Sequence, residues 1–154
     1  SNELQQEIRR RFALADRSGP TINVMSFGFA RGLPRNADLV FDMRFLRNPH
    51  WVAALRPGTG LDAEVADYIA EDPAYETAIG QIEALLETLI PRYQAEGKSY
   101  VTIATGCTGG RHRSVHVAER IAAALRRSGH SPNVIHRNLT SLPQDGLEGR
   151  PPSA

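Results

Sequence analysis

The chain has 154 residues, of which 41% are hydrophobic and 23% charged, with a formal net charge of +1 at pH 7. This length fits one domain with a substantial core, and the composition is that of an ordinary globular protein, not of a disordered or fibrous one. No apolar run is long enough to span a membrane, and no signal peptide opens the chain. Because the chain has a single cysteine, no disulfide forms within it, and we expect a cytoplasmic protein with no membrane partner.

A helix is predicted over residues 3–15, where apolar residues recur at helical spacing. We expect residues 1–19 to be the remnant of a linker helix, followed by a domain over residues 20–140. Within that domain, strands are predicted over Thr21–Phe27 and Asp38–Phe45. Residues 47–59 then have an irregular, proline-containing pattern.

Two helices are expected next, over Leu61–Ala70 and Ala74–Glu96, the second kinked or ended near Pro91. The remaining predicted elements are a strand over Tyr100–Thr105, a helix over Ser114–Arg127, a strand over Val134–Arg137 and a disordered tail over 141–154. Strands that alternate with helices indicate an α/β domain with a mostly parallel central sheet. Ligands of such sheets bind beyond the carboxyl ends of the strands.

The most informative stretch is Gly106–Ser114, with the sequence Gly-Cys-Thr-Gly-Gly-Arg-His-Arg-Ser. It lies between a predicted strand and a predicted helix. Glycines allow backbone N–H groups to approach a ligand closely, and the start of a helix adds unpaired N–H donors. Thr108 adds a hydroxyl, and Arg113 adds a guanidinium that can hold two phosphate oxygens. The loop therefore predicts a phosphate site, although a tight turn that needs glycine only for its backbone angles would have the same pattern.

The same loop also fits the Cys-x5-Arg spacing of cysteine-dependent phosphatases, with Cys107 as nucleophile and Arg113 holding the phosphate oxygens. Gly106 stands where those enzymes have a histidine, and no aspartic acid is identifiable as the general acid. Phosphatase or other phosphoryl-transfer chemistry is therefore the alternative to a binding site without catalytic residues.

Charged residues are separated along the sequence. Residues 106–140 hold six arginines and one acid, whereas residues 60–96 hold nine acids and one base. This separation predicts a face that attracts anions, either a phosphorylated metabolite or a nucleic acid. Arg120, Arg126 and Arg127 are candidate contacts to RNA phosphates, or else a solvated helix face. The acidic stretch is an alternative docking surface for proteins.

Three further residues outside the loop are candidates for ligand contact. Asp42 and Arg44, near the end of a predicted strand, suit sugar hydroxyls and phosphate, although a structural ion pair is the simpler interpretation. His50 is able to donate to a ligand, although a lone histidine more often packs. His112 and His116 are four residues apart, but no second metal-binding motif accompanies them, so no metal site is predicted.

Several of these motifs together resemble one family, the C-terminal domain of RapZ, the RNase adapter. The resemblance covers about residues 20–140 in register. It rests on residues 26–29 (Ser-Phe-Gly-Phe), 40–45 (Val-Phe-Asp-Met-Arg-Phe), 48–51 (Asn-Pro-His-Trp), 56–60, 106–115 and 136–137 (His-Arg).

The resemblance implies a three-layer α/β fold similar to part of 6-phosphofructokinase. It also implies that the domain senses glucosamine-6-phosphate, binds small regulatory RNA, acts with RNase E to control amino-sugar synthesis, and forms homo-oligomers through paired C-terminal domains. Full-length members carry an N-terminal P-loop domain. Because this chain has no Walker A motif, we expect it to be the C-terminal half of such a protein. No cofactor is expected beyond the phosphosugar ligand. The predicted ligand site comprises Asp42, Arg44, His50, Cys107, Thr108, Gly109, Gly110, Arg111, His112, Arg113, Ser114 and Arg137.

Overall fold

A computed structural model describes residues 2–9, 19–148 and 151. Its centre is a sheet of four parallel strands in the order β2-β3-β1-β4. The strands are β1 (Thr21–Gly28), β2 (Leu39–Asp42), β3 (Tyr100–Cys107) and β4 (Asn133–His136). The parallel α/β architecture that the alternation of elements predicts is therefore confirmed.

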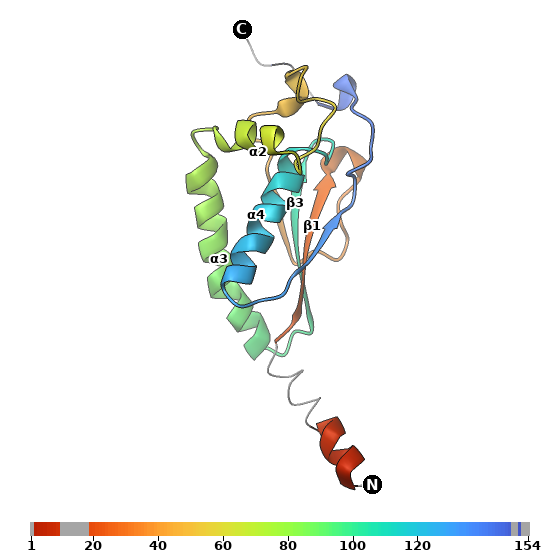
Figure 1. The fold of residues 1–154 in the computed structure, drawn as a ribbon, viewed down its shortest axis with the longest axis vertical. Coiled ribbons are helices and arrows are strands. Elements are labelled where there is room, and N and C mark those ends of the chain that lie inside the picture. The colour runs from red at the N-terminus through yellow and green to blue at the C-terminus, as the bar shows by residue number, and fades with distance from the viewer. Residues whose placement is uncertain (1, 10–18, 149–150, 152–154) are drawn as a thin grey trace.

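Three helices flank the sheet: α2 (Ala63–Ala70), α3 (Tyr75–Ala95) and α4 (Arg113–Arg127). Helix α4 packs directly on β1 and β3, and α3 packs against α4, so both helices lie on the same side of the sheet (Figure 1). Short 3-10 helices η1 (Phe29–Arg31), η2 (Pro49–Trp51) and η3 (Asp145–Leu147) lie in the connecting segments.

The hydrophobic core lies between the sheet and the helices. Alternate residues of a strand point to the same face, and Ile22 and Val24 of β1 are buried together with Val101 and Ile103 of β3. Helix α4 buries Ile121 and its neighbours against them. On the other face of the sheet, residues 34–37 lie beside Met25 and Thr102. Helices, sheet and this covering segment are consistent with the predicted three-layer architecture.

Most predicted elements are present, with shifted ends. The second strand ends at Asp42 because the chain turns there, with Leu46 N–H donating to the carbonyl of Met43. Helix α3 continues past Pro91 to Ala95, since its buried residues, among them Leu86 and Ile90, hold it on the core.

The two ends of the chain depart from expectation in different ways. Residues 2–9 are helical, as the predicted N-terminal helix requires, and its remainder falls on residues outside the described part. The segment expected to be a disordered tail instead contains η3 over Asp145–Leu147. In the described part of the chain, no helix is long and apolar enough to cross a membrane.

Candidate functional site

The loop between β3 and α4 lies at the carboxyl end of the sheet, against the end of β1. Gly110 has φ +82°, a conformation that side-chain-bearing residues rarely adopt. A Cβ on Gly28 would lie 2.5 Å from the carbonyl carbon of Gly109, and a Cβ on Gly110 would lie 2.6 Å from the N of Gly28. The glycines are therefore required by the close approach of two backbones as well as by the turn.

Backbone donors of this loop remain unused. Ala30 N–H donates to the carbonyl of Thr108, and Gly60 N–H donates to the carbonyl of Arg111, so the loop carbonyls are held from both sides. Within residues 19–148, by contrast, the N–H groups of Thr108, Gly109, Gly110 and Arg111 donate to no other protein group. Consecutive free N–H groups beside the N-terminus of a helix form an anion-binding arrangement.

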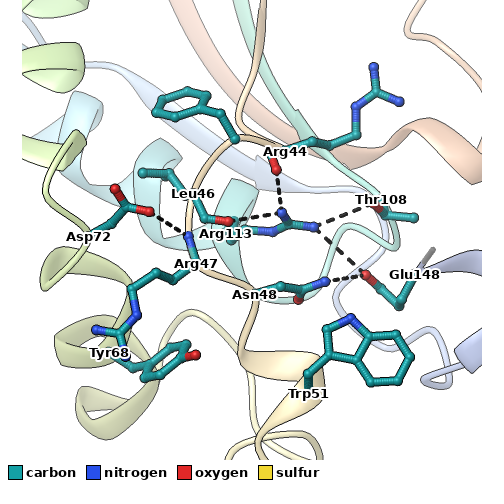
Figure 2. A pocket seen from close by; sticks show the side chains of 11 residues that line it. Arg44, Leu46, Arg47, Asn48, Trp51, Tyr68, Asp72, Thr108, Arg113 and Glu148 are labelled. Carbon is teal, nitrogen blue, oxygen red and sulfur yellow. Dashed lines mark hydrogen bonds and ion pairs between the residues drawn. The ribbon is translucent and has the colours of Figure 1, made fainter. Parts of the chain in front are cut away.

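Arg113, the first residue of α4, points its guanidinium into the site. Arg113 is only 4% exposed, and its Nη1 donates to the backbone carbonyls of Arg44 (2.8 Å) and Leu46 (3.2 Å). Nη2 contacts Thr108 Oγ1 at 3.4 Å and lies 3.8 Å from Glu148 Oε2. Figure 2 shows these groups converging on one guanidinium. Because a buried cation requires compensation by an anion, Arg113 is placed to bind one.

A cavity of about 510 Å³ opens beside Arg113. Its walls come from the β2–η2 connection, from α2 and the turn that follows it, and from the loop (Figure 2). The lining residues are Arg44, Phe45, Leu46, Arg47, Asn48, Trp51, Tyr68, Asp72, Thr108, Arg113 and Glu148. The cavity combines aromatic surface with three arginines, two carboxylates, a hydroxyl and an amide, which suits a small polar ligand.

Asp42 and Arg44 form a pair at the rim of this site. Arg44 Nη2 lies 2.6 Å from Asp42 Oδ2, and Arg44 Nε donates to Oδ1 at 2.9 Å. Hydrogen bonds from Arg44 hold the pKa of the Asp42 carboxyl below its ordinary value. The guanidinium also lies 4.1 Å above the ring of Phe29. Both predicted residues are thus near Arg113, and they neutralise each other.

Arg111 and His112 support the loop from outside. The guanidinium of Arg111 donates to the carbonyls of Arg56 and Pro57, and Nε2 of His112 lies 3.1 Å from the carbonyl of Arg56. Burial, followed by the charge of Arg111, lowers the pKa of His112, so the neutral ring donates from Nε2. These two residues fix the segment 56–58 to the loop.

His50 is 1% exposed, and its Nε2 lies 2.6 Å from Asp145 Oδ1. The backbone N–H of His50 donates to Oδ1 of Asn48, and its backbone carbonyl accepts from Nε of Arg56. The histidine is therefore held at the edge of the site by neighbours on both sides. Its Nδ1 is buried and has no partner within the described residues.

Cys107 is buried at the end of β3, and its thiol donates to Ser114 Oγ at 3.1 Å. Ser114 is itself fixed, because its carbonyl accepts from Thr105 Oγ1. Both predicted residues lie beneath the loop, where they connect β3 to the first turn of α4. Among the described residues, no group of His, Cys, Asp or Glu is arranged to hold a metal ion.

Four predicted arginines lie away from the cavity. Arg137 borders the hollow at residues 34–37 and Thr102, and its Nη2 lies 3.4 Å from the carbonyl of Arg31. Arg120 is paired with glutamates of α3. Arg126 and Arg127 are exposed at the far end of α4, and neither makes an ion pair within residues 19–148.

Several lining residues were not singled out from the sequence. Asn48 and Trp51 belong to the same Asn-Pro-His-Trp motif as His50, so the motif was a signal for them. Arg47 and Tyr68 stack, with the guanidinium carbon 4.0 Å from the ring centre. Asp72 and Glu148 come from distant segments with no local motif, and only the fold brings them to the cavity.

In a comparison with known protein families, the family described as "RapZ C-terminal domain" matches residues 20–140 of this chain. A protein named "nucleotide-binding protein" from Sphingopyxis alaskensis is 71% identical over 154 residues, which is 100% of this chain and 49% of that protein. Proteins of the same name from Rhizorhabdus wittichii and Novosphingobium aromaticivorans are each 58% identical, over 99% and 97% of this chain and 49% of each relative. The chain thus spans about half the length of these curated relatives.

The matched range covers the four strands of the described sheet, helices α2, α3 and α4, and the loop with Arg113. Of the residues that line the cavity, Glu148 alone lies outside it. The chain therefore belongs to the RapZ C-terminal domain family.

Proposed function

We propose that this domain is a regulatory module that binds an amino-sugar phosphate, glucosamine-6-phosphate, in the cavity beside Arg113. The observation that carries the proposal is the buried guanidinium of Arg113 next to four backbone N–H groups that have no acceptor within residues 19–148. A phosphate dianion has three terminal oxygens for these donors, whereas a carboxylate has two, so phosphate suits this number of donors better.

The rest of the cavity suits the sugar. Trp51 offers an apolar ring, while the side chains of Asn48 and Asp72 offer hydrogen-bonding groups to hydroxyls or an amine. The carboxylate of Asp72, close to the ammonium group of a bound amino sugar, would favour that sugar over its neutral analogue. Membership of the RapZ C-terminal domain family fits a regulatory role for the domain.

The proposal includes an adapter role toward small RNA and RNase E, with a homo-oligomer as the active form. Support for RNA contact comes from Arg126 and Arg127, which are exposed at the end of α4 and not neutralised by acids of the described chain. A bound sugar phosphate regulates such contacts only if it binds the RNA-competent and RNA-free states with unequal affinity.

The test is calorimetric titration with glucosamine-6-phosphate, with glucosamine, glucose-6-phosphate and ATP as competitors for the same site. ATP is included because the relatives are named nucleotide-binding proteins. Binding of the amino-sugar phosphate alone, lost in Arg113→Ala and weakened at least about tenfold in Arg113→Lys, would support the proposal. Circular dichroism shows whether the variants remain folded. A wild-type protein that binds none of these compounds would refute it.

A phosphoryl-transfer activity is the second candidate. Cys107 is six residues before Arg113, as the Cys-x5-Arg spacing requires, and its Sγ lies 3.1 Å from Oγ of Ser114, the residue that follows Arg113. Here the Cys107 thiolate forms an S–P bond as the bond between phosphorus and the ester oxygen breaks, and the leaving oxygen takes up the proton that the thiol has lost. Water then cleaves the S–P bond, which releases inorganic phosphate and restores the thiol. Turnover of p-nitrophenyl phosphate that disappears in Cys107→Ser while phosphosugar binding persists would establish this activity. Absence of turnover in the wild type would exclude it for that substrate class.

A further inference from the structure

The C-terminal segment Asp145–Glu148, hereafter the acidic segment, places two carboxylates on two residues of the proposed ligand site. Asp145 Oδ1 lies 2.6 Å from Nε2 of His50. Glu148 Oε2 lies 3.8 Å from Nη2 of Arg113 and accepts a hydrogen bond from Nδ2 of Asn48 at 3.1 Å. Figure 2 shows the Glu148 side chain entering the cavity between Asn48, Thr108 and Arg113.

The Glu148 carboxylate lies directly over the glycine loop. A Cβ on Gly109 would lie 2.8 Å from Glu148 Oε1, and the Glu148 side chain is only 9% exposed. The carboxylate is thus at the loop and beside the buried guanidinium, where the phosphate of a ligand would bind. Two anions do not share this position, because like charges in contact repel strongly.

The segment is attached weakly apart from these carboxylates. None of the residues of η3 is buried, and Leu142 just before it is 76% exposed. Ser141 Oγ contacts the carbonyl of Gly109 at only 3.4 Å. An element without a buried apolar face detaches at little cost in hydrophobic free energy.

We propose that the acidic segment is a built-in competitor, which occupies the anion site until a phosphorylated ligand displaces it. The inference rests on the proposed ligand site. Because the segment is covalently tethered, its local concentration at the site is high, and apparent ligand affinity is reduced by the fraction of molecules in which the site is open. The free N–H groups of the loop give a phosphate more donors than Glu148 uses, so the ligand has the advantage.

The experiment compares the wild type with Asp145→Asn/Glu148→Gln by calorimetric titration with glucosamine-6-phosphate. If the segment occupies the site in nine of ten molecules, the double variant lowers the apparent Kd about tenfold. Glu96→Gln removes one charge from the exposed end of α3 and is the matched control, with no change in Kd expected. An unchanged Kd in the double variant would overturn the proposal. A raised Kd would also overturn it, because the carboxylates would then be ligands of the sugar.

Hydrogen exchange supplies a readout that does not depend on phosphosugar affinity. The N–H groups of Leu147 and Glu148 donate to the carbonyls of Gln144 and Asp145. In the ligand-free protein we expect them to exchange faster in the double variant than in the wild type, and saturation of the wild type with ligand should speed them likewise. If the wild type binds no phosphosugar, the proposed function fails, and exchange in the ligand-free variants still decides the inference. Equal exchange in the two proteins would refute the docking itself.

Discussion

Nε of Arg120 on α4 lies 3.0 Å from Oε1 of Glu83 on α3, and its Nη1 lies 3.2 Å from Oε1 of Glu76. The acidic and basic stretches that are separate in the sequence therefore face each other in the fold. The hydrogen bonds that Arg120 donates to Glu76 are the main cause of the raised pKa of Arg120. The charge available to an external anion is consequently smaller than the arginine count of α4 indicates.

Replacing Arg126 and Arg127 together by alanine should weaken RNA binding and reduce its salt dependence. Each arginine that contacts a phosphate releases about one counterion, so the slope of log Kd against log salt should fall by up to ~2. Gel-shift titrations between ~0.05 and ~0.2 M salt measure this slope. The control is Arg120→Ala, which should lower the free energy of unfolding by about 1 kcal/mol and leave the slope unchanged. A slope that falls only in Arg120→Ala would contradict the assignment.

Gly60→Ala should disrupt the support of the loop. A Cβ there would lie 2.3 Å from the carbonyl oxygen of His112 and 2.5 Å from the N of His116, and backbone atoms of α4 do not yield as a side chain does. We expect a loss of about 1–3 kcal/mol in the free energy of unfolding, together with weaker ligand binding.

The matched control is Gly80→Ala on α3, because, apart from the neighbouring backbone of α3 itself, no atom of the described residues lies within 4 Å of the added Cβ. Alanine there should stabilise the protein by up to about 1 kcal/mol, since glycine is costly inside a helix. Urea denaturation compares the two variants. Equal midpoints for both would show that the contact between Gly60 and α4 is not tight in solution.

Protein stability should fall as the pH drops below about 6.5, the ordinary histidine pKa. Burial lowers the pKa of His112 and of His116, and the charges of Arg111 and Arg120 add to this. The unfolded chain therefore takes up protons at a pH where these folded rings do not, so the free energy of unfolding declines until the folded pKa is reached.

Each histidine contributes at most ~1.4 kcal/mol per pH unit in this window. Denaturant titrations from pH 7.5 to pH 5 measure the slope. His116→Gln should remove the contribution of one histidine to this slope, because glutamine does not titrate. The hydroxyl of Tyr75 lies 2.6 Å from Nε2 of the native ring, and the glutamine amide oxygen can accept from it instead. A slope that is identical in this variant would assign the effect elsewhere.

The strand–loop–helix around Arg113 was predictable because its signals are local: an apolar run, then glycines, then helical spacing. The same holds for β1, for α3 and for the position of β4. Contacts across long separations were not predictable in this way. Arg120 is 37 residues from Glu83 and Glu148 is 100 residues from Asn48, so only the packed fold determines these pairs. The composition after residue 140 indicated disorder, because the segment is polar and lacks apolar periodicity. In the fold, Asp145 contacts His50, and Glu148 contacts Asn48 and Arg113.

A hydrogen-bonded chain of Ser26, His136 and Glu119 has the residue types of a serine hydrolase triad. Ser26 Oγ lies 2.7 Å from Nδ1 of His136, whose Nε2 lies 2.8 Å from Glu119 Oε1. Because a carboxylate only accepts, Nε2 of His136 donates to Glu119, and Nδ1 faces the Ser26 hydroxyl. Ser26, however, is fully buried in β1, so no substrate reaches its oxygen.

We therefore expect the hydrogen bonds between Ser26, His136 and Glu119 to have a structural role. Ser26→Ala should cost about 1–3 kcal/mol of unfolding free energy, because it leaves a ring nitrogen of His136 without a partner. Its effect and that of Glu119→Gln should be non-additive, since both act through the same ring. A fluorophosphonate probe should leave the native protein unlabelled. Labelling that is lost in Ser26→Ala would instead show that β1 opens enough to expose the Ser26 hydroxyl. The three hydrogen-bonded residues would then be a reactive triad and not a structural one.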